Sequence, residues 1–368
     1  GMQESNEIKG VATALRDEFE GLGHQIDSAI VGIPDEVARR VEVWFANPQT
    51  PGGTAFGPSG FLPFDRRKVS MRKFGKGERF WVFPTSRDKL TERIRDLHDG
   101  MGTSEKDIRA RLDVLPETPY VSAVNFGSGW ISFITSVPFT ENEMAVACRF
   151  ADVFGGAYAR FKELKEKEDQ NRELTIQNAL ERVRAQAQGM QVSDEIAGVS
   201  SMLFEEFQGL DYELSHSAIH LIDEENSVVE YWLASSTISR LDASMSKNPY
   251  RVPINKTRSD GTMDARARGE VHHSVEFSTQ KTVENFYVNA WSVRRGTTKK
   301  KARENVRERL PRRDYLAVHR VFHTHGLIAF ATSQRWADAD LAIAKRFTDV
   351  FDSAYDRFQE LKEKEDQN

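Results

Sequence analysis

Two long segments of this 368-residue sequence each occur twice, and this repetition restricts the fold more than any other feature. The segment Phe150–Asn171 returns as Phe347–Asn368 with 17 of its 22 residues unchanged. The segment Gly1–Leu22 returns as Gly189–Leu210 with 13 of 22 residues unchanged. Matches of this length do not arise by chance, so we predict two copies of one domain.

The repetition divides the chain into three parts. The first copy is predicted at 1–171, with its C-terminal helix starting at about residue 140, and the second at 189–368. Residues 172–188 are predicted to be a connecting helix. Both copies end in the tetrapeptide Glu-Asp-Gln-Asn, after which only the first continues. We therefore expect the chain to end mid-array, either as an excised fragment or by natural truncation.

Composition favours globular cytoplasmic domains. Apolar residues make up 39% of the chain, enough for hydrophobic cores, and the net charge of −5 is small. The single cysteine, Cys148, excludes an intrachain disulfide framework and suits a reducing cytosol. No apolar run approaches the roughly 18 residues of a membrane span, and the N-terminus has no signal-peptide pattern. We expect a cytoplasmic protein with no membrane partner.

Each copy is predicted to be an α+β domain. An amphipathic helix opens the copy, strands and an irregular middle follow, and a hairpin precedes the long C-terminal helix. The strands predicted for the first copy are Gln25–Ile33, Arg40–Asn47, Glu78–Pro84, Tyr120–Phe126 and Trp130–Ser136. Those of the second are Glu213–Ile222, Ser227–Ser235, Val283–Trp291, Tyr315–His323 and Leu327–Ser333. We expect each set to form a central antiparallel sheet with the terminal helices on one face.

The end of the first copy, FTENEMAVACRFADVFGGAYARF (139–161), resembles the closing segment of GAF domains, where an acidic turn leads into an amphipathic helix. The connector NRELTIQNALERVRAQAQGM (171–190) resembles helical linkers between the sensor domains of bacterial histidine kinases. The resemblance implies a non-catalytic sensory module that binds a small molecule and signals through coiled-coil helices to an output domain. The residue constellation of cyclic-nucleotide-binding members is absent, so no ligand or cofactor is named. A PAS-like sensor is the alternative fold.

The strand patterns suggest where a ligand pocket would lie. VEVWF and VEYWL place Glu42 with Trp44, and Glu230 with Trp232, at matching positions on one strand face. An aromatic side chain beside a carboxylate would suit a pocket wall, whereas ordinary core packing is the alternative. We predict a more apolar first pocket near Trp44 and Trp81. The more polar second pocket is predicted near three residues, Trp232, His220 and His319.

Seven of the nine histidines fall in the second copy. His319, His323 and His325 are at alternate positions, which would place them on one face if the strand stays regular. Such a group could bind a divalent metal or respond to pH, but no cysteine or evident carboxylate completes a ligand set. Scattered surface and core histidines are therefore the favoured interpretation.

A basic segment and the absence of catalytic motifs limit the remaining functions. Arg294–Arg313 contains ten Lys and Arg residues against Glu304 and Glu308. Charge alone would suit a phosphate or nucleic acid, but the apolar spacing favours a helix with a solvated basic face. No P-loop, nucleophile elbow, HExxH, CxxC or dinucleotide-binding turn is present. An enzyme or a nucleic-acid-binding protein with an unrecognised site is kept as the alternative.

The helix after residue 150 carries apolar residues at coiled-coil spacing. The predicted dimer seam comprises Phe154, Phe161, Ile176, Leu180 and Val183. The last three lie in the connector, where we expect no sheet to cover them. A parallel homodimer would bury them, whereas a solvated spacer helix is the alternative.

Overall fold

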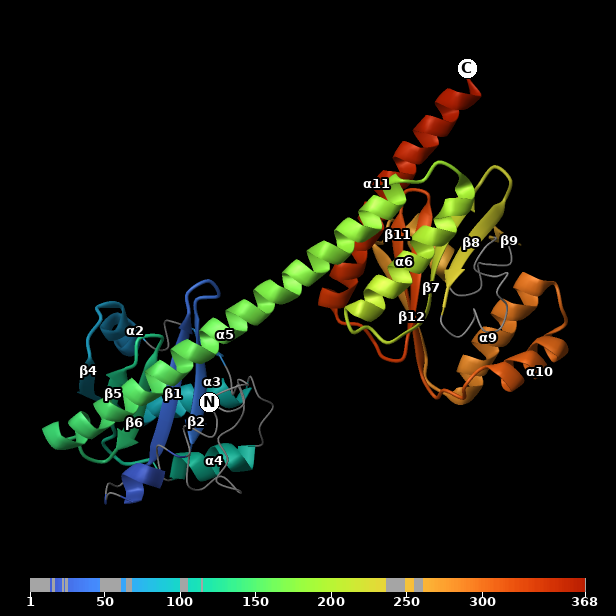
Figure 1. Cartoon of the computed structure of the whole chain (residues 1–368). Helices are drawn as coiled ribbons and strands as arrows, with labels where there is room; N and C mark the ends of the chain where they lie inside the picture. Colours follow the sequence, from blue (N-terminus) through green and yellow to red (C-terminus); the bar gives the residue numbers. More distant parts are fainter. Residues whose placement is uncertain are drawn as a thin grey trace. The chain divides into compact units, whose positions relative to one another are not determined.

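The computed structural model describes residues 14, 17–21, 23, 26–46, 61–63, 68–99, 105–113, 115–235, 249–254 and 261–367 (Figure 1). The chain forms two compact units, Gly1–Asp169 and Gln170–Asn368. Each contains a six-stranded antiparallel sheet and several helices, which confirms the predicted α+β class. An amphipathic helix is predicted at the N-terminus of each copy. Most of the helix predicted for the first copy lies outside the described residues. Within them, no helix is both long enough and apolar enough to cross a membrane.

In its described residues, the first unit runs through six strands and several short helices before its long helix. The strands are β1 (Ser28–Asp35), β2 (Arg40–Ala46), β3 (Phe61–Pro63), β4 (Phe80–Pro84), β5 (Tyr120–Asn125) and β6 (Trp130–Thr135). The helices are α2 (Lys68–Gly75), α3 (Arg87–Asp99), α4 (Glu105–Asp113) and α5 (Glu141–Gln188). The strand order across the sheet is β3-β2-β1-β6-β5-β4.

The second unit repeats this connectivity. Its strands are β7 (Leu214–Asp223), β8 (Val228–Ala234), β9 (Tyr250–Pro253), β10 (His272–Phe277), β11 (Leu316–His323) and β12 (Gly326–Thr332). Its helices are η2 (Ser193–Glu195), α6 (Ile196–Gly209), α8 (Thr262–Ala267), α9 (Gln280–Arg295), α10 (Lys299–Arg309) and α11 (Asp338–Asp366). The order β9-β8-β7-β12-β11-β10 is that of the first sheet, strand for strand.

Local sequence explains the tight first hairpin of each unit. The Asp35 carboxylate accepts a hydrogen bond from the Ala38 N–H at 3.0 Å, and Asp223 accepts one from the Asn226 N–H at 2.9 Å. Each turn then closes through a residue with positive φ, Arg39 in the first unit and Ser227 in the second. An aspartate that bonds the backbone three residues on is a strong turn former.

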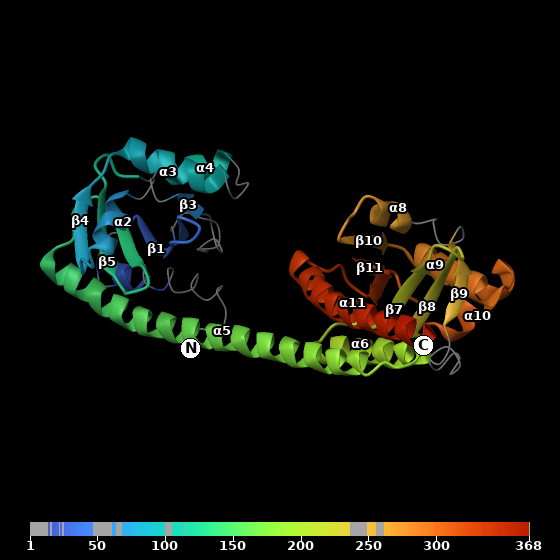
Figure 2. The same cartoon turned by 90° about the horizontal axis from the view of Figure 1, so that it is seen from above.

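Each sheet has two buried faces, and alternate residues of a strand enter different cores. In the second unit Ile219 and Phe330 pack against α6, α11 and the end of α5, whereas Val318 and Leu327 face the opposite side. Figure 2 shows α6 and α11 on one face of this sheet and α9 with α10 on the other. In the first unit α5 covers one face, and α3 and α4 lie over the other. We call these the helix face and the outer face.

The long helix α5 runs without interruption from the first unit into the second. A capping box starts it: Thr140 N–H donates to the Glu143 carboxylate at 2.6 Å, and Glu143 N–H donates to Thr140 Oγ1 at 3.3 Å. Each residue from 162 to 175 is exposed. This stretch therefore belongs to neither core.

The predicted dimer seam assumed that nothing in the same chain covers the apolar residues of the connector, and this assumption is wrong. Ile176, Leu180 and Val183 are only 4%, 4% and 0% exposed, because α6 and α11 cover them within the same chain. Phe154 and Phe161, the seam residues in the first unit, are also buried. The connector is thus part of the second unit's core rather than a free spacer with an apolar stripe.

The strand predicted at Val283–Trp291 is also wrong, because this segment lies inside α9. The Thr279 hydroxyl caps the helix by accepting from the Thr282 N–H at 3.3 Å, and Gly296 ends it with φ 58°. Valine and aromatic residues favour strands, but here they recur at three- and four-residue spacing and form a helical face. Besides the four strands that the sequence predicted correctly, the second sheet contains β9 and β10, which the sequence patterns did not indicate.

Candidate ligand-binding site

A cavity of about 390 Å³ lies in the second unit between the outer face of the sheet and α9. This volume is within the usual range for small-molecule pockets. One face of α9 lines it with residues three or four apart, namely Asn285, Phe286, Asn289, Ala290, Val293 and Arg294. The sheet contributes residues from all six strands, including Ala218, His220, Tyr231, Val318, Arg320 and Leu327. The wall is therefore largely apolar, with a few polar groups facing inward.

Two arginines give this apolar cavity a positive charge. The Arg294 guanidinium lies over the Tyr231 ring at 5.3 Å from its centroid and over the Tyr250 ring at 5.9 Å. Burial lowers the pKa of Arg294 from its usual value. Arg320 enters from β11 and is 5% exposed. Among the described residues that line the cavity, none has a carboxylate.

His216 and His220 line the cavity from the same face of β7, because alternate residues of a strand point to the same side. Burial, together with the smaller effect of the nearby charges of Arg294, Arg313 and Arg320, lowers the pKa of His216 to about 3. The pKa of His220 lies well below its usual value, first through burial and then through Arg294 and Arg320. Both imidazoles are therefore neutral near pH 7, so each offers one hydrogen-bond donor and one acceptor.

The first unit fills the corresponding space with a tryptophan. Trp130 pairs with Gly32 in the first sheet exactly where Leu327 pairs with His220 in the second. A Cβ atom on Gly32 would lie 2.8 Å from the Trp130 ring, so only glycine admits the indole there. Around it the outer face packs Trp81 and Phe74, with ring centroids 6.4 and 5.6 Å from Trp130. The first unit is the more apolar of the two on this face.

The structure separates the residues that the sequence assigned to pockets. Trp44 and Trp232 are fully buried on the helix face, with Glu42 and Glu230 on the same side of their strands. Trp81 lies on the outer face, so it does not share a pocket with Trp44. His220 does line the cavity, but Trp232 is on the opposite side of the sheet. Both tryptophans are core residues, as the alternative interpretation held.

The two glutamates have different environments. Glu230 receives a hydrogen bond from Arg251 Nε at 2.8 Å. Burial raises the pKa of Glu42, and the charges of Arg40 and Lys165 oppose this shift. Neither carboxylate faces the cavity.

His319 lies on the helix face, apart from both the cavity and the other two predicted metal ligands. Its ring stacks on Trp336 with centroids 4.7 Å apart, and its Nδ1 is 2.8 Å from the Ser274 hydroxyl. The Trp336 N–H donates to its Nε2 at 3.3 Å. Burial lowers its pKa to about 4, so His319 is a neutral residue within a hydrogen-bonded core.

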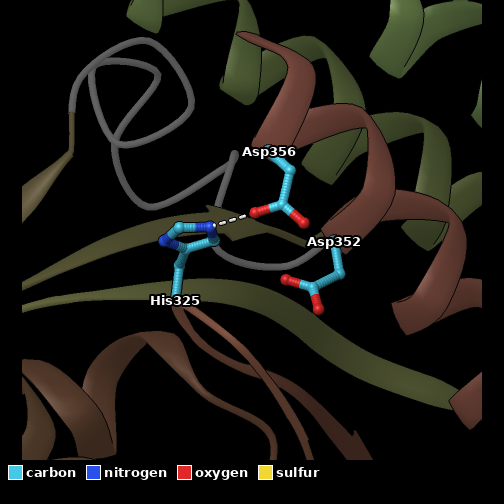
Figure 3. Close-up of side chains that lie close together, drawn as sticks. All are labelled: His325, Asp352 and Asp356. Carbon is cyan, nitrogen blue, oxygen red and sulfur yellow. Dashed lines mark hydrogen bonds and ion pairs between the residues drawn. The ribbon is translucent and has the colours of Figure 1, made fainter. Parts of the chain in front are cut away.

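His325 is brought close to two carboxylates of α11, Asp352 and Asp356 (Figure 3). One possible ligand atom from each residue lies within 4.8 Å of the others, and His325 Nε2 is 2.5 Å from Asp356 Oδ1. A histidine with two carboxylates suits a divalent cation. However, Asp352 already accepts hydrogen bonds from the Thr324 N–H and hydroxyl, and it lies 3.1 Å from His323 Nδ1. These contacts attach the β11–β12 turn to α11.

Most of the basic segment is exposed, but two of its arginines are paired. Arg303 Nε and Arg307 Nη2 lie 3.1 and 3.0 Å from the Glu284 carboxylate on α9. The pairing fixes α10 against α9 and offsets part of the positive charge. The segment thus helps to hold the outer wall of the cavity in place.

Sequence reasoning missed the two arginines that define the cavity. Arg294 was counted only as part of a basic run, and Arg320 lies between two histidines of an apolar strand. The available signal was a comparison of the copies: the strand registers align Arg320 with Ala123, and Tyr231 with Val43. Charged or polar residues that replace core residues in one copy mark a divergent site.

Two of the three comparisons with known proteins found no match. No protein family matches the sequence, and no curated protein matches it. Among solved structures, one similar chain is described as a methyl-accepting chemotaxis protein, residues 122 to 287. It is 16% identical, with a TM-score of 0.30, and the match covers 50% of this chain and 98% of that one. A likeness at this level does not assign a function.

Proposed function

We propose that this chain is a non-catalytic, GAF-like regulatory module whose second unit binds a small molecule. The observation that carries the proposal is the cavity between α9 and the outer face of the second sheet. It combines an apolar wall with a few polar groups that converge on one space, which is the usual composition of a ligand pocket. The corresponding face of the first unit packs tryptophan instead, so ligand binding is assigned to the second unit.

The same strands connect the cavity to the helices. On β7, His220 faces the cavity while its neighbours Ile219 and Leu221 pack in the core with α5, α6 and α11. A ligand that shifts this strand would therefore alter the packing of the helices, because close-packed cores transmit small displacements. We propose that α11 and α5 carry this change to an output domain beyond the chain.

We also propose that the chain forms a homodimer, but through other residues than the predicted seam. The predicted seam is buried, but Leu164 and its repeat counterpart Leu361 are 49% and 48% exposed on α5 and α11. A two-fold pairing of these helices would cover both positions. Light scattering at micromolar concentration tests it, and a monomer that persists across the concentration range removes this part of the proposal.

Ligand binding is tested by transplanting the first unit's packing into the second. The double variant His220→Gly with Leu327→Trp recreates the Gly32–Trp130 pair, so an indole should replace the imidazole in the cavity wall and change its shape and polarity. Full-length protein is screened with a metabolite library for an increase in melting temperature. We expect hits for the natural sequence and for the control Leu327→Ile, and none for the double variant. Hits that persist in a folded double variant would show that the ligand binds elsewhere.

A further inference from the structure

We propose that the second unit binds a divalent transition-metal ion, such as Zn²⁺, between the β11–β12 turn and helix α11. The proposed ligands are His325 from the turn and Asp352 and Asp356 from the helix (Figure 3). Helix α11 covers the helix face of the sheet, whereas the ligand cavity lies on the outer face. The inference therefore goes beyond the proposed function and does not depend on it.

The possible donor atoms of the three residues are already close together. His325 Nε2 lies 2.5 Å from Asp356 Oδ1, and one donor atom from each residue lies within 4.8 Å of the others. Ligand atoms that are about 2.1 Å from one ion lie about 3 to 4 Å from each other. A small rotation of the exposed Asp356 side chain would therefore place all three around an ion. An imidazole favours a transition metal, whereas magnesium and calcium prefer oxygen ligands.

Neighbouring groups hold two of the ligands in place. The Asp352 carboxylate accepts hydrogen bonds from the Thr324 N–H at 3.2 Å and from its hydroxyl at 2.8 Å, and His323 Nδ1 lies 3.1 Å away. These contacts use at most three of the roughly four acceptor positions of an ionised carboxylate, so one remains for a metal ion. The His325 carbonyl accepts from the Ile222 N–H at 2.9 Å, which attaches the turn to β7. Outer contacts of this kind orient the ligands of metal sites.

The negative charge of the two aspartates favours a bound cation over a simple hydrogen-bonded contact. Two carboxylates this close repel each other when both are ionised. Within the described part of the chain, neither Asp352 nor Asp356 forms an ion pair with a lysine or arginine. Arg266 reaches the turn and donates to the Thr324 carbonyl at 3.1 Å, but its charge is paired with Glu224 at 3.0 Å. A divalent ion would supply the compensating positive charge.

Comparison of the two copies gives independent support. The repeated helix segments share 17 of 22 residues, so they differ at five positions, and two of these five are the proposed carboxylate ligands. The aligned copies have Ser128 in place of His325, Gly155 in place of Asp352, and Ala159 in place of Asp356. In the first unit this helix packs directly on the turn, since a Cβ atom on Gly155 would lie 2.6 Å from the Phe126 carbonyl oxygen. The same contact between turn and helix therefore carries possible metal ligands in the second copy alone.

Metal titration of the full-length chain tests the proposal, after a chelator has removed any bound metal. Isothermal calorimetry with Zn²⁺ measures affinity and stoichiometry, and Mg²⁺ is the comparison ion. The variants Asp356→Ala and His325→Ser introduce the residue types of the first unit. Asp349→Ala on α11 and His272→Ser on β10 are the matched controls, because each removes the same type of side chain from an exposed position outside the cluster. Melting temperatures without metal show that each variant is folded.

We expect the natural chain to bind a Zn²⁺ ion at least about tenfold more tightly than Mg²⁺. Each of the two ligand variants should weaken the binding of Zn²⁺ about tenfold or more, whereas the controls should change it by less than about twofold. Zn²⁺ should also raise the melting temperature of the natural chain and of the controls, but not that of the ligand variants. The proposal is overturned if Zn²⁺ does not bind at concentrations up to about 1 mM, or if either ligand variant binds it like the natural chain. Neither result bears on the cavity, whose ligand is tested separately with metabolites.

Discussion

At the residue scale, the difference between the two units reduces to a few substitutions on the outer face of the sheet. Trp130 with Gly32 becomes Leu327 with His220, and Ala123 becomes Arg320. The first exchange removes an indole at one position and adds an imidazole at its cross-strand neighbour. The last substitution places a guanidinium on a sheet face that is apolar in the first unit. Both changes together put polar groups on the face that lines the cavity.

The buried His216 should make the second unit sensitive to acid. Its pKa is about 3 in the folded protein against 6.5 for the free side chain, so protons bind preferentially to the unfolded chain below pH 6.5. The contribution of neutral His216 to the free energy of unfolding is therefore fully present above pH 6.5 and is lost as the pH falls toward 3. At pH 5 the loss from this residue is about 2 kcal/mol.

Urea unfolding at pH 7.5, 6.5 and 5 measures this effect. His216→Asn should flatten the pH dependence, whereas His272→Asn on exposed β10 should leave it unchanged. Equal slopes in all three proteins would contradict the assignment of a neutral buried imidazole. Burial lowers the pKa of three further residues in the same sense, namely His220, His319 and His323.

Gly326 should be nearly irreplaceable in the β11–β12 hairpin. A Cβ atom at this position would lie 2.0 Å from the His220 carbonyl oxygen, which is backbone and cannot move without breaking the β12–β7 ladder. We expect Gly326→Ala to cost about 3 kcal/mol of unfolding free energy. The control is Gly209→Ala at the end of α6, where a Cβ atom meets nothing within 4 Å. Equal stability of the two variants in denaturant titrations would refute this account.

At the element scale, the sequence predicted those elements whose partners are local. Both hairpins and both long C-terminal helices follow from alternation, turn residues and helical spacing, and the structure confirms them. The prediction failed where tertiary contacts decide. Val283–Trp291 has strand propensity, but the cap at Thr279 and the outer face of the sheet select a helix. The cavity could not be derived because it depends on which strand face α9 covers.

The apolar spacing of the connector predicted a seam between two chains, whereas the structure buries these residues within one chain. Leu180 and Val183 are buried against α6 and α11, so aspartate at both positions would place two charges in the core of the second unit. We expect Leu180→Asp with Val183→Asp to destabilise this unit by more than about 5 kcal/mol, through lost packing and buried charge. Near-ultraviolet circular dichroism and hydrogen exchange should report its unfolding.

The matched control is Leu174→Asp, six residues earlier on the same helix, where the side chain is 60% exposed. It should cost less than about 0.5 kcal/mol. A double variant that keeps native stability and changes only its state of association would restore the idea of a seam between chains.

At the scale of the whole molecule, separate cores predict separate unfolding. The apolar clusters of the first unit contain residues of Gly1–Asp169, and those of the second contain residues of Gln170–Asn368. Among the described residues, α5 runs through both units, and its residues 162–175 are exposed. We expect calorimetry to resolve two transitions, of which Gly326→Ala and a metabolite that binds the cavity move only the one that belongs to the second unit. A single cooperative transition would contradict this independence.

The continuous helix can then be tested as the route of communication. Replacing Asp169 with Pro and Gln170 with Gly should interrupt α5 within its exposed stretch, because proline removes a backbone donor and clashes with the preceding turn. Both transitions should persist, since neither core uses these side chains. In the natural chain we expect a metabolite bound in the cavity to change amide exchange in the α5 segment Phe150–Phe161, and in the interrupted chain it should not. Replacing the same two residues with alanine keeps the helix and should keep the response. If the interrupted chain responds like the natural one, the signal does not travel through α5.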